Sequence, residues 1–531
     1  MEISGRQLIA EALSSSSNDT FHSVNPQTGD PFGSPFYEAT LEDVDDACWL
    51  ADQAYNDLRV TSAELRGQLL DAIADEMMAL GDQLLERAHA ETGLPMGRLT
   101  GERGRAVNQT RLFADLVREG SWVDARIDQG NPDRTPFPKP DVRSMLTGIG
   151  PVAVFGASNF PLAIGVAGTD TIAALGAGCP VIAKAHPGHP GTCELLGKAI
   201  LKAVQNTGLP PGSFSMLQGK GYDVGQHLVR HKAVKAVAFT GSLKGGRALF
   251  DAAAKREDPI PVYAEMGSTN PVFLLPGALK ERASTIAQGY IQSVNLGVGQ
   301  FCTNPGIICG IEGDDFGVFA KEASQLAAQV DPTTMLHEGI FSGYKDGVSR
   351  LLDHEGIRLL DERFSESGEN VNKAKCVLLQ THASILEASQ HLLEEEVFGP
   401  ASMLVTCNSV HDMIDIADKL EGHLTATVHG TEEDLATHST LIRLLEKKVG
   451  RLIFNGFPTG IEVCAAMHHG GPYPATTDSH FTSIGTGAIL RFGRPICYQN
   501  FPQPALPEPL RNENTAGVWR LVDNERTKAS I

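Results

Sequence analysis

The sequence predicts an α/β protein built on a parallel sheet with helices on its faces. After Gly150, apolar segments alternate with helix-like ones: Val152–Phe155, Val181–Lys184 and Val234–Phe239 are predicted strands, separated by helices over Ile164–Leu175 and Thr192–Val204. Strands that alternate with helices at this spacing form parallel sheets, because each return to the sheet needs a crossover. The length of 531 residues exceeds one ordinary core, so more than one domain is expected.

The segments around this sheet differ in pattern. Before it, residues 40–116 are helical in pattern, with Thr61 and Glu64 as a capping box ahead of apolar residues at helical spacing. Residues 121–145 are irregular and rich in Gly, Pro, Asp and Arg. A long irregular segment of this sort is usually functional or an interface, and we expect a protruding arm. A second α/β unit is expected from about Pro261, and residues 501–531 form a polar, proline-rich tail.

The composition excludes several classes of partner. A hydrophobic content of 42% with 20% charged residues is typical of a globular protein, and a net charge of −20 argues against nucleic acid or an anionic membrane. The nine cysteines show neither a CxxC pair nor metal-ligand spacing, which favours reduced thiols in the cytoplasm and no metal site. We find no signal-peptide pattern at the N-terminus and no apolar run near the ~20 residues of a membrane span.

Cys302 lies in a segment of small and polar residues, from Gly297 to Gly306, between a helix-like run and an apolar strand. A catalytic nucleophile needs such a loop, held by rigid elements and open to a substrate. Because the thiolate is the attacking form, a catalytic cysteine also needs a base or oriented dipoles nearby. Taken alone, Cys302 is more typical of a small buried hydrophobic residue than of a nucleophile.

Other stretches offer chemistry at predicted strand ends. The turn Thr240–Gly246 precedes a helix, where free N–H groups and the helix dipole bind phosphate, although many such turns bind nothing. Glu265 ends a strand-like run beside Gly267, either as a reactive carboxylate or as part of a salt bridge. The charged run Glu102–Arg111 fits a solvated helix face as well as the wall of a pocket.

Four separated segments resemble the NAD(P)-dependent aldehyde dehydrogenases, and the resemblance extends from about residue 20 to 500. The segments are Gly156–Pro161 (GASNFP), Glu265–Ser268 (EMGS), Gly299–Cys302 (GQFC) and Glu396–Pro400 (EVFGP). The resemblance implies a Rossmann-type NAD(P)-binding domain of residues 1–120 and 147–260 and a catalytic domain of residues 261–465. It also implies a small β oligomerisation arm, residues 121–146 and 481–500, that pairs subunits into a homodimer or homotetramer.

The resemblance also implies a role for each matching residue. Cys302 attacks the aldehyde to give a thiohemiacetal and, after hydride transfer to the nicotinamide, a thioester. Asn159 and the backbone N–H of Cys302 hold the oxyanion, and Glu265, a buried carboxylate with a raised pKa, activates water. The expected cofactor residues are Lys184 at the ribose, Gly241, Ser242 and Gly246 at the pyrophosphate, and Glu396 and Phe398 at the nicotinamide ribose. A catalytically dead structural or binding homologue is a distant alternative, against which the presence of both Cys302 and Glu265 argues.

The sequence departs from the common pattern at the adenosine ribose. Pro187 lies three residues after Lys184, where many NAD-preferring relatives carry a glutamate. Without that carboxylate a 2′-phosphate is not repelled, so NADP is expected to be preferred over NAD, with Lys184, His186 and Lys220 nearby. Together with Asn304-Pro305, this departure resembles the 2-ketoglutarate semialdehyde (2,5-dioxovalerate) dehydrogenases most; a bacterial fatty (long-chain) aldehyde dehydrogenase is the alternative.

The substrate pocket is the least determined part of the site. A keto-acid aldehyde carries an anionic end, which needs a cation or amide donors. Arg111 and Gln109 are the candidates, on the helix expected to wall the entrance, and Phe160, Phe301 and Phe457 are expected to line the pocket. If these rings line it without a cation, long-chain aldehydes become the better interpretation.

Overall fold

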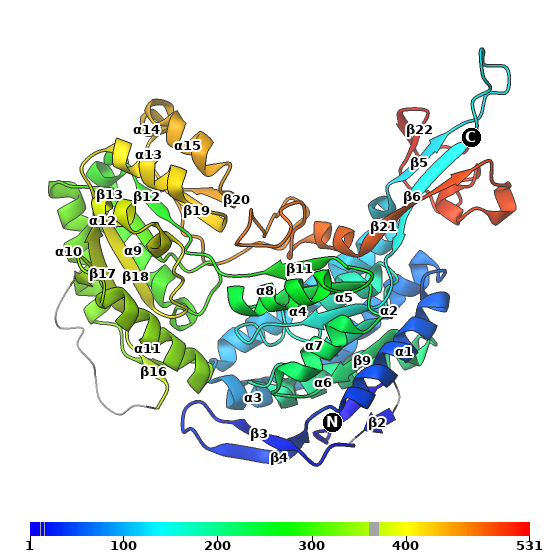
Figure 1. The fold of residues 1–531 in the computed structure, drawn as a ribbon, viewed down its shortest axis with the longest axis horizontal. Helices are drawn as coiled ribbons and strands as arrows, with labels where there is room; N and C mark the ends of the chain where they lie inside the picture. Colours follow the sequence, from blue (N-terminus) through cyan, green and yellow to red (C-terminus); the bar gives the residue numbers. More distant parts are fainter. Residues whose placement is uncertain (11, 15, 361–370) are drawn as a thin grey trace.

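A computed structural model describes residues 1–531 except 11, 15 and 361–370. The α/β prediction is confirmed: two seven-stranded sheets, each flanked by helices, form the body of the molecule. Figure 1 shows the first sheet and its helices below and to the right, the second at the left, and a β arm that projects at the upper right. In the described part of the chain, no helix has both the length and the apolar character needed to cross a membrane.

The first sheet has the strand order β11-β10-β7-β8-β9-β1-β2. Its central strands are parallel, and β1 adds antiparallel to β9 from the N-terminus. Burial on both faces explains the nearly uninterrupted apolar runs of these short strands. The strands are β1 Gln7–Ile9, β2 Ala12–Ser14, β7 Val152–Phe155, β8 Val181–Lys184, β9 Phe214–Leu217, β10 Ala236–Thr240 and β11 Val262–Glu265.

The helices of this half begin before the sheet and continue between its strands. They are α1 Leu41–Leu58, α2 Ala63–Ala79, α3 Gly81–Thr92, α4 Met96–Glu119, α5 Thr169–Gly176, α6 Pro190–Asn206, α7 Tyr222–Arg230 and α8 Leu243–Ala254. Ser62, not Thr61, caps α2: its hydroxyl accepts from the N–H of Leu65. The predicted cap is therefore wrong by one residue, because Ser62 offers the same hydroxyl one step closer to the first turn.

The second sheet has the order β15-β17-β18-β13-β12-β19-β20, parallel except for the edge strand β15. Its strands are β12 Val272–Leu274, β13 Ile307–Ile311, β15 Arg358–Leu359, β17 Val377–His382, β18 Ala401–Cys407, β19 His423–His429 and β20 Val449–Phe454. Its helices are α9 Pro276–Asn295, α10 Asp314–Ala328, α11 Glu338–Leu352, α12 Ala383–Ala388, α13 Val410–Lys419, α14 Glu432–Thr437 and α15 Ser439–Leu445. The expectation that a second unit begins at Pro261 is corrected by β11, which pairs in parallel with β10 of the first sheet.

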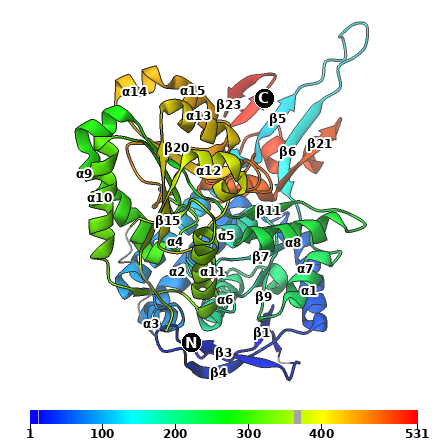
Figure 2. The ribbon, with the colours of Figure 1, turned by 60° about the vertical axis from the view of Figure 1, so that its left-hand side comes forward.

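The arm sheet combines segments from distant parts of the chain, in the order β21-β6-β5-β22-β23. Its strands are β5 Ala125–Asp128, β6 Val142–Gly148, β21 Gly493–Gln499, β22 Arg520–Val522 and β23 Glu525–Thr527. Figure 2 shows the hairpin of β5 and β6 extending away from the body. The segment expected to be only a tail thus supplies two strands. Two small antiparallel pairs complete the fold: β3 Thr20–Val24 with β4 Pro31–Tyr37, and β14 Thr333–Thr334 with β16 Lys373–Ala374.

Candidate active site

A cavity of about 330 Å³ opens at the carboxyl ends of the parallel strands of the first sheet. Ligands bind at this edge of open α/β sheets, because the loops that follow the strands converge there. The cavity brings together eight residues that the sequence analysis singled out: Asn159, His186, Gly241, Ser242, Glu265, Cys302, Glu396 and Phe398.

The loop that carries Cys302 has an unusual backbone. Gly297, Val298 and Gly299, just before it, have φ of 57°, 61° and 65°. A β-branched residue such as Val298 rarely adopts this left-handed conformation, so the surrounding packing must hold it there. At Gly299 a Cβ would lie 2.2 Å from the carbonyl oxygen of Gly399, so only glycine allows this approach. The loop that carries Cys302 therefore packs directly against the backbone of the segment after Glu396.

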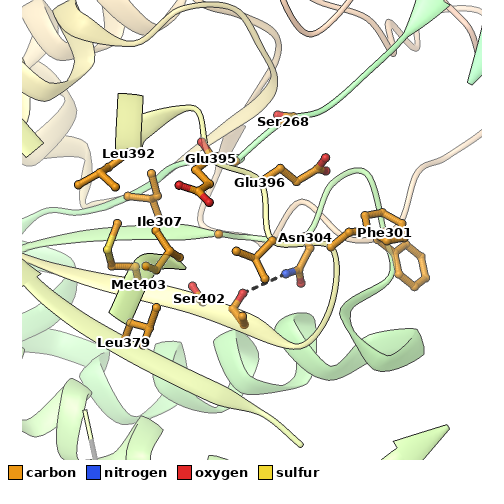
Figure 3. A pocket seen from close by; sticks show the side chains of 16 residues that line it. Ser268, Phe301, Asn304, Ile307, Leu379, Leu392, Glu395, Glu396, Ser402 and Met403 are labelled. Carbon is orange, nitrogen blue, oxygen red and sulfur yellow. Dashed lines mark hydrogen bonds between the residues drawn. The ribbon is translucent and has the colours of Figure 1, made fainter. Parts of the chain in front are cut away.

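Side-chain amides fix the rest of this loop. Asn270 Nδ2 donates to the carbonyls of Cys302 (2.8 Å) and Asn304 (2.9 Å). Asn304 Nδ2 in turn donates to the carbonyl of Ala401 (3.3 Å), the bond drawn in Figure 3. Asn159 Nδ2 donates to the carbonyl of Gln300 at 3.0 Å, which leaves its second N–H for another acceptor. Asn304, which the sequence analysis singled out together with Pro305, thus carries a structural hydrogen bond.

His469 joins the predicted catalytic pair, and the sequence analysis missed it. Its Nε2 lies 3.5 Å from Cys302 Sγ and 3.0 Å from Glu265 Oε1. Ser483 donates to the other oxygen of Glu265 at 2.5 Å. His469 and Glu265 are both buried. The sulfur of Cys302, a carboxylate oxygen of Glu265 and a ring nitrogen of His469, three atoms that could ligate a metal, lie within 4.8 Å of one another. The hydrogen bonds between the three side chains account for this closeness.

The charges of this group shift its pKa values in opposite directions. Burial raises the pKa of the Glu265 carboxyl, but the charge and hydrogen bond of His469, with the bonds from Ser483 and Cys302, lower it below its ordinary value. The expected raised pKa is therefore wrong, because the partners outweigh burial. The pKa of the Cys302 thiol is raised by burial and by the neighbouring Glu265, so the thiol is protonated at rest and needs an acceptor for its proton.

Glu396 extends from the loop toward Ser268, whereas Glu395 lies on the other side of the backbone (Figure 3). Glu395 pairs with Arg350 Nε at 2.9 Å. Burial, with a smaller contribution from the charge of Glu265, raises the pKa of Glu396 to about 8. Glu396 therefore faces the cavity as a neutral carboxyl near pH 7.

The other end of the cavity contains residues expected at the phosphate and ribose of the cofactor. Ser242 caps α8, with its hydroxyl accepting from the N–H of Gly245. Gly246 does not line the cavity; a Cβ there would lie 2.7 Å from Met266, so this glycine lets α8 approach the sheet. Lys184 Nζ donates to the carbonyls of Ala185 and Gly219, and burial lowers its pKa to about 8.

Glu38, a carboxylate that the sequence analysis did not single out, lies beside Lys184 and Lys220. Its Oε1 accepts from the backbone N–H of Lys220 at 2.9 Å, and its charge raises the pKa of Lys184 against the larger effect of burial. Burial also lowers the pKa of His186, so this imidazole is neutral. Glu38 is 182 residues away from Lys220 in the sequence, so no local sequence pattern could predict that it lies beside this lysine.

The structure brings two of the five expected substrate residues together. The rings of Phe160 and Phe301 meet edge to face at 5.2 Å, beside Cys302. The other three lie elsewhere. Arg111 is half exposed and pairs with Asp75 at 2.9 Å, Gln109 is buried and donates to the hydroxyl of Thr169, and Phe457 packs against Tyr290 and His429.

Solved structures share this fold. Aldehyde dehydrogenase C from Pseudomonas syringae, in complex with NAD+ and octanal, superposes with a TM-score of 0.78 at 20% identity, over 94% of this chain and 98% of its own. An E. coli NADP-dependent enzyme gives 0.76 at 22% identity, over 94% and 98%. At these identities the likeness shows the fold alone.

Two relatives found by sequence are much more similar to this chain than these solved structures are. The chain is 48% identical to alpha-ketoglutaric semialdehyde dehydrogenase 2 of Azospirillum brasilense over 99% of this chain and 100% of that protein. It is 45% identical to the alpha-ketoglutaric semialdehyde dehydrogenase of Acinetobacter baylyi over 99% of both. The family model "Aldehyde dehydrogenase family" matches residues 13–472, a span that contains Cys302, Glu265, Asn159 and the whole cavity around them. With the fold, the cavity and the sequence in agreement, the chain belongs to the aldehyde dehydrogenase family, whose members use NAD or NADP.

Proposed function

We propose that this protein oxidises 2-ketoglutarate semialdehyde to 2-ketoglutarate, with NADP or NAD as the hydride acceptor. The carrying observation is the identity of 48% and 45%, over essentially the full length, to two alpha-ketoglutaric semialdehyde dehydrogenases. The reaction would be the last oxidation of a route that degrades sugar acids or hydroxyproline.

Three side chains would carry the chemistry. Cys302 attacks the aldehyde carbon while Glu265, hydrogen-bonded to His469 at 3.0 Å, accepts the thiol proton and releases it to solvent. Ionised again, Glu265 then accepts a proton from the water that hydrolyses the thioester. The free N–H of Asn159 and the backbone N–H of Cys302 would hold the oxyanion, and one such donor typically contributes ~10²–10³ in rate. The nicotinamide, when bound, takes the hydride.

The cavity has the chemistry that a dinucleotide needs. Gly241 and Ser242 present a helix N-terminus for the pyrophosphate, and Glu396 and Phe398 lie at the end nearest Cys302 for the nicotinamide ribose. At the adenosine end, Lys184, Lys220 and the neutral His186 would surround the ribose. Gly246 supports the site by letting α8 pack closely.

We further propose that NADP is preferred over NAD. Pro187 brings no carboxylate to the ribose, and Lys184 and Lys220 supply two cations against the single carboxylate of Glu38. The net local charge favours a 2′-phosphate, which accepts charge-assisted hydrogen bonds. An equal or better kcat/KM with NAD would overturn this preference.

The arm sheet supports a homodimer or homotetramer. Its edge strand β21 is largely exposed, and an unpaired edge offers its N–H and C=O groups to a partner strand. Light scattering should give a mass of two or four chains; a mass near the single chain's 56.7 kDa would refute assembly. All nine cysteines are free, which supports a reducing, cytoplasmic setting.

The substrate is tested by comparing kcat/KM for 2-ketoglutarate semialdehyde, succinate semialdehyde and decanal, followed at the absorbance band of the reduced nicotinamide. We expect the keto-acid semialdehyde to be the best of the three. A clear advantage of decanal would replace this function with that of a fatty aldehyde dehydrogenase. No turnover of any aldehyde would indicate a catalytically dead homologue.

A further inference from the structure

The anionic end of the substrate needs a counter-charge that neither Arg111 nor Gln109 supplies. In 2-ketoglutarate semialdehyde, four carbon–carbon bonds of about 1.5 Å separate the aldehyde carbon from the carboxylate carbon, so the two are roughly 5 Å apart in an extended chain. The counter-charge must therefore lie close to Cys302. Among the described residues, the guanidiniums of Arg105 and Arg451 act electrostatically on Cys302 and are not paired with a carboxylate.

We propose that Arg105 of α4 and Arg451 of β20 form an anion subsite that binds the 2-oxo acid end of the substrate. This inference rests on the proposed function and identifies the residues that would give it specificity. Arg105 and Arg451 come from opposite halves of the molecule, so the subsite would combine a residue of each half beside Cys302.

Arg105 is positioned by the aromatic pair beside the nucleophile. Its guanidinium carbon lies 5.5 Å from the centre of the Phe160 ring, and Phe160 meets Phe301, the residue before Cys302, at 5.2 Å. Burial lowers the pKa of Arg105, while Glu102, Cys302 in its ionised form and Glu462 raise it. Arg105 is thus near enough to sense the charge of the reacting atom.

The guanidinium of Arg105 has no hydrogen bond or ion pair with any described residue, and its Nε is buried without a partner. Two carboxylates lie near it, and neither neutralises it by contact. Glu102 accepts the backbone N–H groups of Leu162 (2.8 Å) and Ala163 (3.0 Å), and burial raises its pKa. Glu462 is exposed. A partly buried, unpaired guanidinium is costly to maintain and gains most from an anionic ligand.

Arg451 approaches Cys302 from the second sheet. The carbonyls of Pro458 (2.6 Å) and Gly460 (3.2 Å) accept from its two terminal nitrogens and fix the guanidinium. Its Nε is buried and has no partner in the described part of the chain. The charge of Arg451 lowers the pKa of Cys302, against the larger raising effects of burial and Glu265. An anion held here would be near the reacting carbon.

Arg98 has a different role on the same face of α4. Its Nη2 donates to the carbonyl of Asn159 at 2.6 Å, and its guanidinium carbon lies 5.0 Å from the Phe160 ring and 5.2 Å from the Phe301 ring. Arg98 is therefore already used to position Asn159 and the aromatic pair. Arg105, by contrast, has no hydrogen-bonded or carboxylate partner among the described residues.

The test compares Arg105→Met and Arg451→Met with Arg111→Met. Arg111 is the matched control, because it removes the same charge from the same helix at a position paired with Asp75 on the outer surface. The readout is the ratio of kcat/KM for 2-ketoglutarate semialdehyde to that for pentanal, an uncharged aldehyde of equal length. Loss of a charge-assisted contact should lower this ratio ten- to hundredfold in the first two variants. The inhibition constant of 2-ketoglutarate should rise in parallel.

The outcomes separate this subsite from the proposed function. A wild-type enzyme with no preference for the semialdehyde over pentanal overturns the proposed function and the subsite with it. A wild-type preference that survives in both variants, or that Arg111→Met lowers as much, overturns the subsite alone. If Arg105→Met fails to fold by circular dichroism, Arg105→Lys replaces it. The lysine keeps the charge but not the two-pronged contact, so a partial fall in the ratio is expected, and an unchanged ratio contradicts the proposal.

Discussion

Replacement of His469 by phenylalanine should impair the base at the centre of the site. The substitution keeps an aromatic ring but removes the nitrogen that lies 3.0 Å from Glu265 Oε1 and 3.5 Å from Cys302 Sγ. A hydrogen bond to a charged group contributes ~1.5–3 kcal/mol, and 1.36 kcal/mol corresponds to one pKa unit. Burial remains in the variant, so the pKa of Glu265 should rise.

The sign of the effect on activity follows from this rise. Glu265 must be ionised to accept a proton, and in the wild type His469 and Ser483 keep its pKa low. In His469→Phe the acid limb of the pH–rate profile should move to higher pH, and deacylation should slow about ten- to hundredfold at the acidic pH values of that limb, where Glu265 is ionised in the wild type but protonated in the variant. Stopped-flow measurement should then show a burst of reduced cofactor followed by slow turnover.

His468→Gln is the matched control for this experiment. His468 neighbours His469 in the chain but makes no hydrogen bond to Cys302 or Glu265 in the described structure. The control should keep the wild-type profile. Ser483→Ala should shift the acid limb in the same direction, because Ser483 bonds the other oxygen of Glu265. An acid limb that stays in place in His469→Phe would refute the assignment of His469 as the partner of the base.

Three further changes test other parts of the site. Cys302→Ser should abolish aldehyde oxidation yet bind the cofactor normally by calorimetry, and wild-type turnover in this variant would refute the covalent mechanism. Glu38→Gln should tighten NADP more than NAD, while Pro187→Glu should weaken NADP more than NAD; equal effects on both cofactors would remove these residues from the 2′-phosphate site. Glu396→Gln tests the raised pKa. The folded state holds the proton of Glu396 with a pKa of about 8, against 4.5 for an unperturbed carboxyl, so wild-type stability should fall relative to the variant as pH rises between these values. Urea unfolding across that range should show ~1.4 kcal/mol per pH unit, and a constant difference between the two proteins would contradict the raised pKa.

The sequence determines the strands of the first sheet well because each is a short apolar run between turn residues. The predicted strands Val152–Phe155 and Val181–Lys184 coincide with β7 and β8. The helix predicted from Ile164 instead begins at Thr169, because Gly168 has an extended backbone at the N-cap. A side chain at Gly168 would also clash with the carbonyl of Ala163. Local pattern carries no information about such contacts.

The same limit of local sequence patterns applies to the candidate site. Cys302, Glu265 and Asn159 are found because each belongs to a short segment that resembles a known family. His469 lies 204 residues from Glu265 in the chain, next to another histidine and two glycines, and only the folded chain shows which of the two histidines faces the base. Arg105 and Arg111 differ in the same way. Both belong to one charged helix, and its packing alone decides that the first faces Phe160 and the second faces Asp75.

The arm sheet has a consequence for how the protein folds during its synthesis. Strands β5 and β6 emerge early in synthesis, whereas β21, β22 and β23 belong to the last part of the chain. The side chain of Asp523, for example, accepts from Gln129 across 394 residues. Closing such a loop is slow, and the arm cannot be completed before β21, β22 and β23 have left the ribosome. Until then, both outer edges of the β5–β6 hairpin stay open. Nascent chains on one messenger therefore depend on this late closure to avoid premature edge-to-edge pairing.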